Sequence, residues 1–151
     1  MTELEKPTSI TGGCLCESVR YTITFPPDHP WDDCIGTCQC VWCRKVTGSL
    51  LFRFHQLKKT DVKFDADSTL RTYQATPGKH RGFCNNCGSY LFYRGETSKF
   101  INLAVGCFDK DAMKKYGTIL TKAGGHLYVC DEIPGVTDHL EGDRFETEPH
   151  D

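Results

Sequence analysis

The sequence has no long apolar run and no surplus of positive charge. Its 151 residues contain nothing that approaches the roughly 20 consecutive apolar residues of a membrane-spanning helix. The opening residues 1–9 carry Glu3 and Glu5 and do not resemble a secretory leader. A formal net charge of −2 gives no electrostatic footprint for nucleic acid. We therefore expect a cytoplasmic protein with neither a membrane nor a nucleic acid as its partner.

Internal repeats and low-complexity segments are also missing, which argues against a solenoid. The length suits one domain with a core of its own. From Thr137 onward the composition becomes acidic, which predicts a mobile tail. We accordingly expect an N-terminal tail over residues 1–11, a folded domain over residues 12–136 and an acidic C-terminal tail over residues 137–151.

Cysteine, in contrast, is abundant. Seven of the ten cysteines fall into three clusters, which are Cys14-x-Cys16, Cys38-x-Cys40-x-x-Cys43 and Cys84-x-x-Cys87. In a reducing compartment such spacings indicate metal ligands rather than disulfides. Structural zinc usually has four protein ligands, whereas catalytic zinc has three and an open position. Two pairs and a triplet therefore predict a closed site with four thiolates and an open site with three.

Several other residues are alternative ligands for the triplet. Cys34 could supply a fourth thiolate and close that site, and His55 and His126 are further candidates. A lone histidine is, however, more often a surface or core residue than a ligand. Cys107 and Cys130 follow apolar strand patterns and are most simply interpreted as buried thiols.

The rest of the sequence favours β structure. Val19, Tyr21, Ile23 and Phe25 alternate with polar residues, which is typical of a strand with one buried face. Further strands are predicted over residues 50–55, 70–75, 89–94 and 99–108. One short helix is predicted over residues 110–116, with Asp109 as its N-cap and Gly117 after its end. The pattern indicates an antiparallel, mainly β fold.

Three segments carry a resemblance to a known family. They are residues 12–16 (GGCLC), residues 38–49 (CQCVWCRKVTGS) and residues 82–88 (GFCNNCG), followed by Leu91 and Phe92. In this order they resemble the glutathione-dependent formaldehyde-activating enzyme family from about Gly12 to Val129. The resemblance implies a β-tent fold and two Zn²⁺ ions per chain. It assigns Cys14, Cys16, Cys84 and Cys87 to the structural ion, and Cys38, Cys40 and Cys43 to the catalytic one.

The activity that the resemblance implies is a carbon–sulfur lyase, which joins formaldehyde and glutathione into S-(hydroxymethyl)glutathione. The partner would be glutathione, an adduct of it or a related small thiol. Arg44, Lys45 and Ser49 match family positions beside the triplet and are expected to contact the carboxylates of such a ligand. Trp42 departs from the small or acidic residue expected there and would narrow the pocket. The alternative is a non-catalytic, zinc-stabilised binding module on the same fold, as the resemblance to centromere protein V permits.

Overall fold

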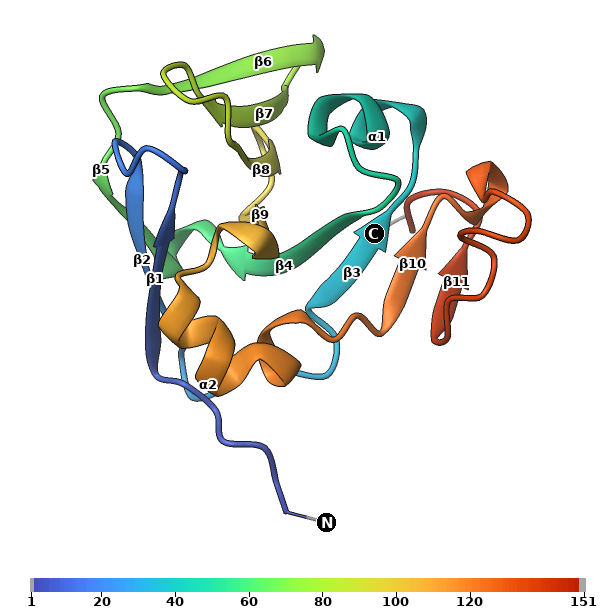
Figure 1. Cartoon of the computed structure of the whole chain (residues 1–151), viewed down its shortest axis with the longest axis horizontal. Helices are drawn as coiled ribbons and strands as arrows, with labels where there is room; N and C mark the ends of the chain where they lie inside the picture. Colours follow the sequence, from blue (N-terminus) through green and yellow to red (C-terminus); the bar gives the residue numbers. More distant parts are fainter. Residues whose placement is uncertain (1, 150–151) are drawn as a thin grey trace.

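The computed structural model describes residues 2–149, and its regular structure is mainly β (Figure 1). A three-stranded antiparallel sheet has the order β1 (Ser9–Gly13), β2 (Arg20–Thr24) and β5 (Val62–Ala66). In β2 the side chains of Tyr21 and Ile23 are buried, and those of Arg20 and Thr22 are not. The predicted alternation of this segment is thus confirmed, as is the mainly β fold class.

The second sheet has eight strands. Their order is β11 (Asp143–Phe145), β10 (Gly125–Leu127), β3 (Ile35–Cys38), β4 (Phe52–Lys58), β9 (Phe100–Ala104), β8 (Tyr90–Gly95), β7 (Lys79–Cys84) and β6 (Leu70–Thr76). From β3 to β6 all neighbours are antiparallel, but β10 runs parallel to both β3 and β11. The expectation of purely antiparallel strands is therefore wrong at this edge. A long crossover precedes β10, and crossovers of that kind permit parallel pairing.

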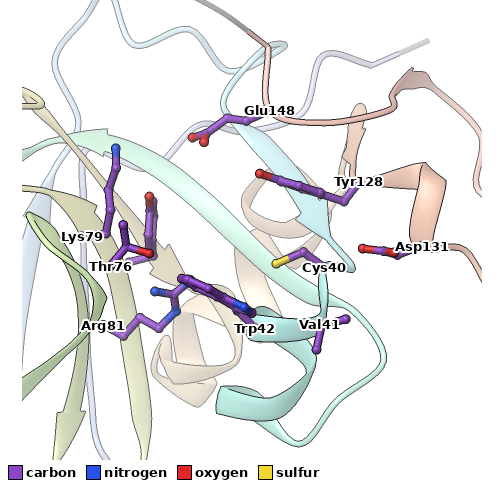
Figure 2. A pocket seen from close by; sticks show the side chains of 10 residues that line it. Cys40, Val41, Trp42, Thr76, Lys79, Arg81, Tyr128, Asp131 and Glu148 are labelled. Carbon is purple, nitrogen blue, oxygen red and sulfur yellow. The ribbon is translucent and has the colours of Figure 1, made fainter.

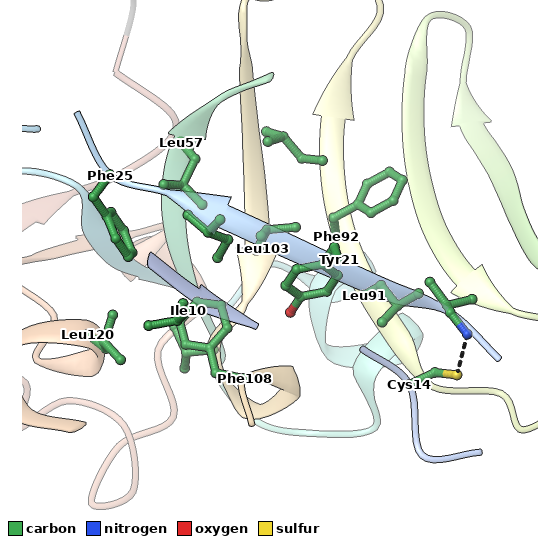
Figure 3. Packing of buried hydrophobic residues seen from close by; sticks show 14 of the residues in the cluster. Ile10, Cys14, Tyr21, Phe25, Leu57, Leu91, Phe92, Leu103, Phe108 and Leu120 are labelled. Carbon is green, nitrogen blue, oxygen red and sulfur yellow. Dashed lines mark hydrogen bonds between the residues drawn. The ribbon is translucent and has the colours of Figure 1, made fainter. Parts of the chain in front are cut away.

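The main hydrophobic core lies between the two sheets (Figure 3). Tyr21 of β2, Leu91 and Phe92 of β8 and Leu103 of β9 are at most 1 % exposed. Cys14 and Cys84 are buried members of the same cluster. Burial of each large apolar side chain contributes about 1.5–3 kcal/mol, so this core stabilises the packing of the two sheets. The four-cysteine motif is therefore continuous with the core.

Two α-helices lie within residues 2–149, where one was predicted. The predicted helix is α2 (Lys110–Thr121), which continues through Gly117 because Ile119 and Leu120 pack against the core. Asp109 precedes it without a side-chain capping bond. Neither α2 nor any other described helix has the length and apolar character to cross a bilayer.

The helix that was not predicted is α1 (Val41–Thr47), within the cysteine triplet. The remaining helical turns are of the 3₁₀ type and are η1 (Lys59–Asp61), η2 (Val105–Cys107) and η3 (Val129–Asp131). The strand predicted over residues 99–108 therefore ends at Ala104, where η2 begins.

The chain after residue 136 packs against the domain, although the sequence predicted a mobile tail. Thr137 is 2 % exposed, and its hydroxyl donates to Gln39 Oε1 at 2.6 Å. Strand β11 extends the large sheet. At the other end, β1 begins inside the expected N-terminal tail. Met1, His150 and Asp151 belong to the predicted tails and lie outside the described residues.

Candidate metal centres and ligand cavity

The structure brings Cys14, Cys16, Cys84 and Cys87 together, with all four sulfurs within 4.8 Å of one another. The first pair lies in the turn after β1, and the second pair lies at the end of β7 and in the turn that follows. Gly88 has φ of 78°, a left-handed conformation that glycine adopts without strain, and its N–H donates to the Cys84 carbonyl. The turn thereby directs both sulfurs of the second pair to one point.

The four sulfurs fit a tetrahedral ion. Zn–S bonds of about 2.3 Å place neighbouring sulfurs about 3.8 Å apart. The Cys14–Cys16 and Cys16–Cys84 sulfur distances are 3.6 Å and 3.7 Å. The backbone N–H of Val19 donates to Cys14 Sγ, and the Ser18 hydroxyl lies 3.3 Å from Cys16 Sγ. Such polar contacts orient and stabilise thiolate ligands, so this group can hold a closed zinc site.

Cys38, Cys40 and Cys43 form the second group, again with all sulfurs within 4.8 Å of one another. Cys38 ends β3, Cys40 is the N-cap residue of α1, and Cys43 lies in its first turn. The backbone N–H of Cys43 donates to Cys40 Sγ at 3.4 Å. The Cys38 thiol, and secondarily that of Cys43, lower the pKa of Cys40. Three soft donors on one tight turn can hold Zn²⁺ and leave a fourth position open.

Buried polar contacts hold the triplet loop in place. Gln39 is fully buried, and its Oε1 accepts from Arg44 Nη2 at 2.9 Å and from the Thr137 hydroxyl. Arg44 also donates to the carbonyls of Asp131 and Leu50. The helix α1 ends at Gly48, which has a left-handed φ of 67° and donates to the Arg44 carbonyl. Residues that follow β10 in the sequence, Asp131 and Thr137, thus hold the triplet loop in place.

A cavity of about 470 Å³ opens beside the triplet (Figure 2). The Cys40 sulfur points into it, with Tyr128 on one side and the Trp42 ring on the other. Two cations and two carboxylates also line it, from Lys79, Arg81, Asp131 and Glu148. A smaller space of about 70 Å³, lined by Cys38, Cys40 and Cys43 among others, shares part of this wall. The triplet therefore faces a cavity of the size that small-molecule ligands use.

Arg81 on β7 is the most informative residue of this wall. Its guanidinium carbon lies 5.3 Å from the centre of the Trp42 ring and 5.1 Å from that of Tyr93. The side chain is buried, yet its Nε and Nη1 have no hydrogen-bond partner among the described residues. Asn102, which lines the smaller space, has a buried Oδ1 that likewise lacks a hydrogen-bond partner among the described residues. Buried polar atoms are usually paired, so these atoms are available to hydrogen-bond a polar ligand in the cavity.

Backbone strain occurs at the same cavity. Tyr128 has φ of 59°, which is uncommon for a residue other than glycine. It lies between β10 and η3 and faces Cys40 across the cavity. Non-glycine residues in this conformation cluster at ligand sites, where the surrounding structure maintains the strain. Burial also raises the pKa of the Tyr93 hydroxyl to about 12, so it remains a proton-bearing donor.

The three residues predicted to contact a ligand beside the triplet occupy other places. Arg44 binds Gln39 and backbone carbonyls, and the Ser49 hydroxyl donates to the Leu51 carbonyl. Lys45 is exposed on α1. None of them lines either space beside the triplet. Their role in ligand binding stays a prediction, whereas Lys79, Arg81 and Glu148 were not foreseen from the sequence.

The alternative ligands of the triplet also lie elsewhere. Cys34 groups with His29 and His55 rather than with the triplet. His126 Nδ1 lies 2.7 Å from the Thr37 hydroxyl, and its Nε2 lies 2.8 Å from the Glu141 carbonyl. Of the two cysteines interpreted as buried, Cys107 is largely covered but Cys130 is exposed, because η3 turns it outward.

Comparison with known proteins agrees with this arrangement. The family model of the glutathione-dependent formaldehyde-activating enzyme matches residues 9–130. The chain belongs to this family. The match includes both cysteine groups and ends before β11 and Glu148. Membership connects the chain with glutathione-related formaldehyde activation and with a possible metal site.

A crystal structure of a Rhodobacter sphaeroides protein has a similar fold, with a TM-score of 0.54. The two sequences are 18% identical, and the similarity covers 67% of this chain and 89% of the other. At that identity the likeness supports the fold alone. A search of the curated proteins finds no match.

Proposed function

We propose that this chain is a zinc-dependent carbon–sulfur lyase that interconverts formaldehyde and a small thiol with their S-hydroxymethyl adduct, glutathione being the leading thiol. The observation that carries the proposal is that the cysteine triplet and the unpartnered Arg81 guanidinium share one cavity. Family membership supports the reaction class. The open triplet supports a thiol as the ligand, because thiolate sulfur is a natural fourth donor beside three cysteines.

The charges of the cavity suit glutathione, which carries two carboxylates and one ammonium group. Lys79 and Arg81 can bind the carboxylates, since a guanidinium forms paired hydrogen bonds with a carboxylate. Asp131 and Glu148 can bind the ammonium group. Trp42 covers one side of the space and limits the width of the ligand. The ligand sulfur is thereby directed toward Cys40.

Zinc held by Cys38, Cys40 and Cys43 would lower the pKa of the substrate thiol and keep its sulfur beside the aldehyde carbon. In the addition, the sulfur–carbon bond forms, the π electrons of the carbonyl move to oxygen, and that oxygen takes a proton. The thiol proton leaves to solvent. Tyr93 Oη, which keeps its proton at neutral pH, can donate a hydrogen bond to the developing alkoxide. Arg81 and Lys79 hold the thiol substrate in orientation for the attack.

The test is exchange NMR on glutathione, formaldehyde and their adduct at equilibrium. The zinc-loaded chain should accelerate interconversion well above the spontaneous rate. Cys40→Ser and Arg81→Met should each remove most of the acceleration. Cys107→Ala should retain it, because Cys107 lies outside both cysteine groups and outside this cavity.

Two results would overturn the proposal. If the chain binds glutathione but leaves the exchange rate unchanged, the non-catalytic binding module is the correct interpretation. If Cys40→Ser accelerates exchange as well as the unaltered chain does, the triplet is not the reaction centre.

A further inference from the structure

A third group of metal-type ligands lies apart from both cysteine groups. His29 Nε2, Cys34 Sγ and His55 Nε2 converge within 4.8 Å of one another. His29 and Cys34 come from the loop between β2 and β3, and His55 comes from β4. The three side chains are 7 %, 3 % and 0 % exposed, respectively. Nothing in the proposed lyase reaction uses them.

The distances within this group are compatible with a single bound ion. The two Nε2 atoms are 2.9 Å apart, and Cys34 Sγ lies 3.1 Å from His55 Nε2 and 3.4 Å from His29 Nε2. Around tetrahedral zinc, two nitrogens are separated by about 3.3 Å, and a nitrogen and a sulfur by about 3.6 Å. Small side-chain shifts would therefore produce a triangular set of three ligands with the ion above their plane.

The hydrogen bonding of His55 directs a lone pair into the group. Its Nδ1 lies 3.0 Å from the Leu120 carbonyl in α2. A carbonyl oxygen only accepts, so Nδ1 carries the ring proton and Nε2 of the neutral ring is unprotonated. Metal-binding histidines almost always have such a contact from the second ring nitrogen, because it fixes the tautomer and the orientation of the ring.

Each proton of this group can find an acceptor, since the Cys34 thiol can donate to the Trp31 carbonyl at 3.8 Å and His29 Nε2 can donate to His55 Nε2. Hydrogen bonding does not, however, account for all three close contacts. The lone pair of His55 Nε2 faces both His29 Nε2 and Cys34 Sγ, but it can accept only one proton. If His29 donates to His55 Nε2, the Cys34–His55 contact has no proton between the two atoms; if Cys34 donates, the same holds for the His29–His55 contact. An ion at the centre would instead receive one lone pair from each ligand.

Aromatic side chains surround the group, and an acidic cavity lies beside Cys34. Phe25 and Trp31 pack on the His29 ring with centroid distances of 5.1 Å and 4.6 Å. Cys34 lines a cavity of about 380 Å³, which shares Asn102 and Glu148 with the smaller space beside the triplet. The charged residues of its wall are all acidic and are Asp32, Asp33, Asp143 and Glu148. This negative charge beside Cys34 raises the local concentration of cations.

We propose that His29, Cys34 and His55 form a third metal site of this chain, which takes Zn²⁺ or a closely related transition-metal ion. Two imidazoles and one thiolate are donors that zinc and copper both accept. Ion binding displaces the Cys34 proton to solvent, since the thiolate is the ligand form. The bound ion links the β2–β3 loop to β4, and through His55 to α2.

The site is tested by counting zinc on the full chain without an affinity tag, after equilibration with Zn²⁺ and removal of the unbound ion. The unaltered chain should bind three ions, one for each group. Cys34→Ala should bind one fewer. Cys107→Ala, a matched loss of a covered thiol outside the three groups, should bind as many as the unaltered chain. Equal zinc content in Cys34→Ala and Cys107→Ala would overturn the proposal.

A second measurement needs no variant and holds even if Cys34→Ala fails to fold. Within residues 2–149 the other two groups contain only cysteine, so the imidazole ligands of bound zinc should come from His29 and His55. X-ray absorption of the zinc-loaded unaltered chain should therefore show the outer-shell scattering of imidazole. A spectrum with sulfur and water-type ligands alone would contradict the third site, and it would leave the proposed lyase reaction unaffected.

Discussion

The two cysteine groups present the same donor atom in different surroundings. The four-cysteine group joins residues 68 positions apart and belongs to the main core. The triplet lies within six consecutive residues, packs with a smaller cluster and faces a cavity. An ion in the first group connects distant segments, whereas an ion in the second connects almost none. Stability should therefore depend on the first group, and ligand binding on the second.

The largest effect is expected from Cys84→Ser. Cys84 is fully buried in the core, and its sulfur lies 3.7 Å from that of Cys16. Loss of a closed zinc site removes metal-binding free energy that is also folding free energy, so we expect destabilisation by more than about 5 kcal/mol, or insoluble protein. Cys14→Ser should behave in the same way. Thermal unfolding and zinc content provide the measurement, and the exposed Cys130→Ser is the control.

That prediction would fail if Cys84→Ser were soluble and lost one zinc without a change in melting temperature. The four-cysteine group would then not be structural, and the expected dependence of stability on this group would be wrong.

The opposite outcome is expected at Cys40→Ser. Cys40 is the N-cap residue of α1 and accepts the Cys43 N–H, and serine is itself a favoured N-cap. The fold should therefore change in stability by less than about 1 kcal/mol, while the triplet loses affinity for its ion and turnover is abolished. Thermal unfolding, zinc affinity and exchange NMR together measure this separation. A large drop in melting temperature would show that the triplet is a folding element as well.

A smaller effect is expected at Arg81, which belongs to the ligand cavity but not to either cysteine group. Arg81→Met should weaken glutathione binding about tenfold, or about 1.4 kcal/mol, and leave zinc content unchanged. Arg94→Met is a matched control, since Arg94 also packs over a ring, that of Phe92, and has an unpartnered Nε among the described residues. It lies outside the cavity. Equal glutathione affinities in the two variants would remove Arg81 from the ligand site.

The smallest effect concerns an ion pair near the four-cysteine group. Asp109 accepts from Arg20 and from the Thr11 hydroxyl, so it connects α2 with β1 and β2. Arg20, and then Thr11, lower the pKa of Asp109. Its contribution is therefore present above the unfolded pKa of about 3.9 and is lost as the pH falls through the lower folded value.

Asp109→Asn should cost about 1 kcal/mol at neutral pH, since the pair is partly exposed and screened. Urea unfolding at neutral pH and at acidic pH measures it. The difference between the variant and the unaltered chain should shrink in acid. A cost that is the same at both pH values would assign the effect to packing rather than to charge.

The individual cysteine clusters and many of the strands were accessible from the sequence because both follow local rules, whereas the pairing of Cys14 and Cys16 with Cys84 and Cys87 came from the resemblance to the family. Ligand spacing and strand alternation are properties of short segments, and β2 and the convergence of Cys38, Cys40 and Cys43 are of this kind. The parallel pairing of β10 depends on where a crossover returns, which no local pattern contains. Helix α1 escaped prediction because its turns are fixed by Cys40 and Gly48 around the ligands.

The residues that line the ligand cavity could largely not be predicted, because they are brought together by tertiary structure and not by a local sequence pattern. Arg81 lies three residues before Cys84 on β7, and only the pairing of strands turns it toward Trp42. The local signal was limited to a cation in a segment that ends at Cys84, a candidate metal ligand. Glu148 reaches the cavity from a segment whose acidic composition suggested a solvated tail. His29 and His55 are 26 positions apart and carry no ligand spacing between them.

Cadmium NMR of the cadmium-loaded Cys34→Ala chain tests the central claim most directly, because each bound ion gives its own resonance. The account predicts two resonances, from the four-cysteine group and the triplet. Added glutathione should shift the triplet resonance toward that of a four-sulfur ion and leave the other unmoved, since only the triplet has an open position. Two resonances that both remain fixed as glutathione is added would show that the triplet is closed and would contradict the account.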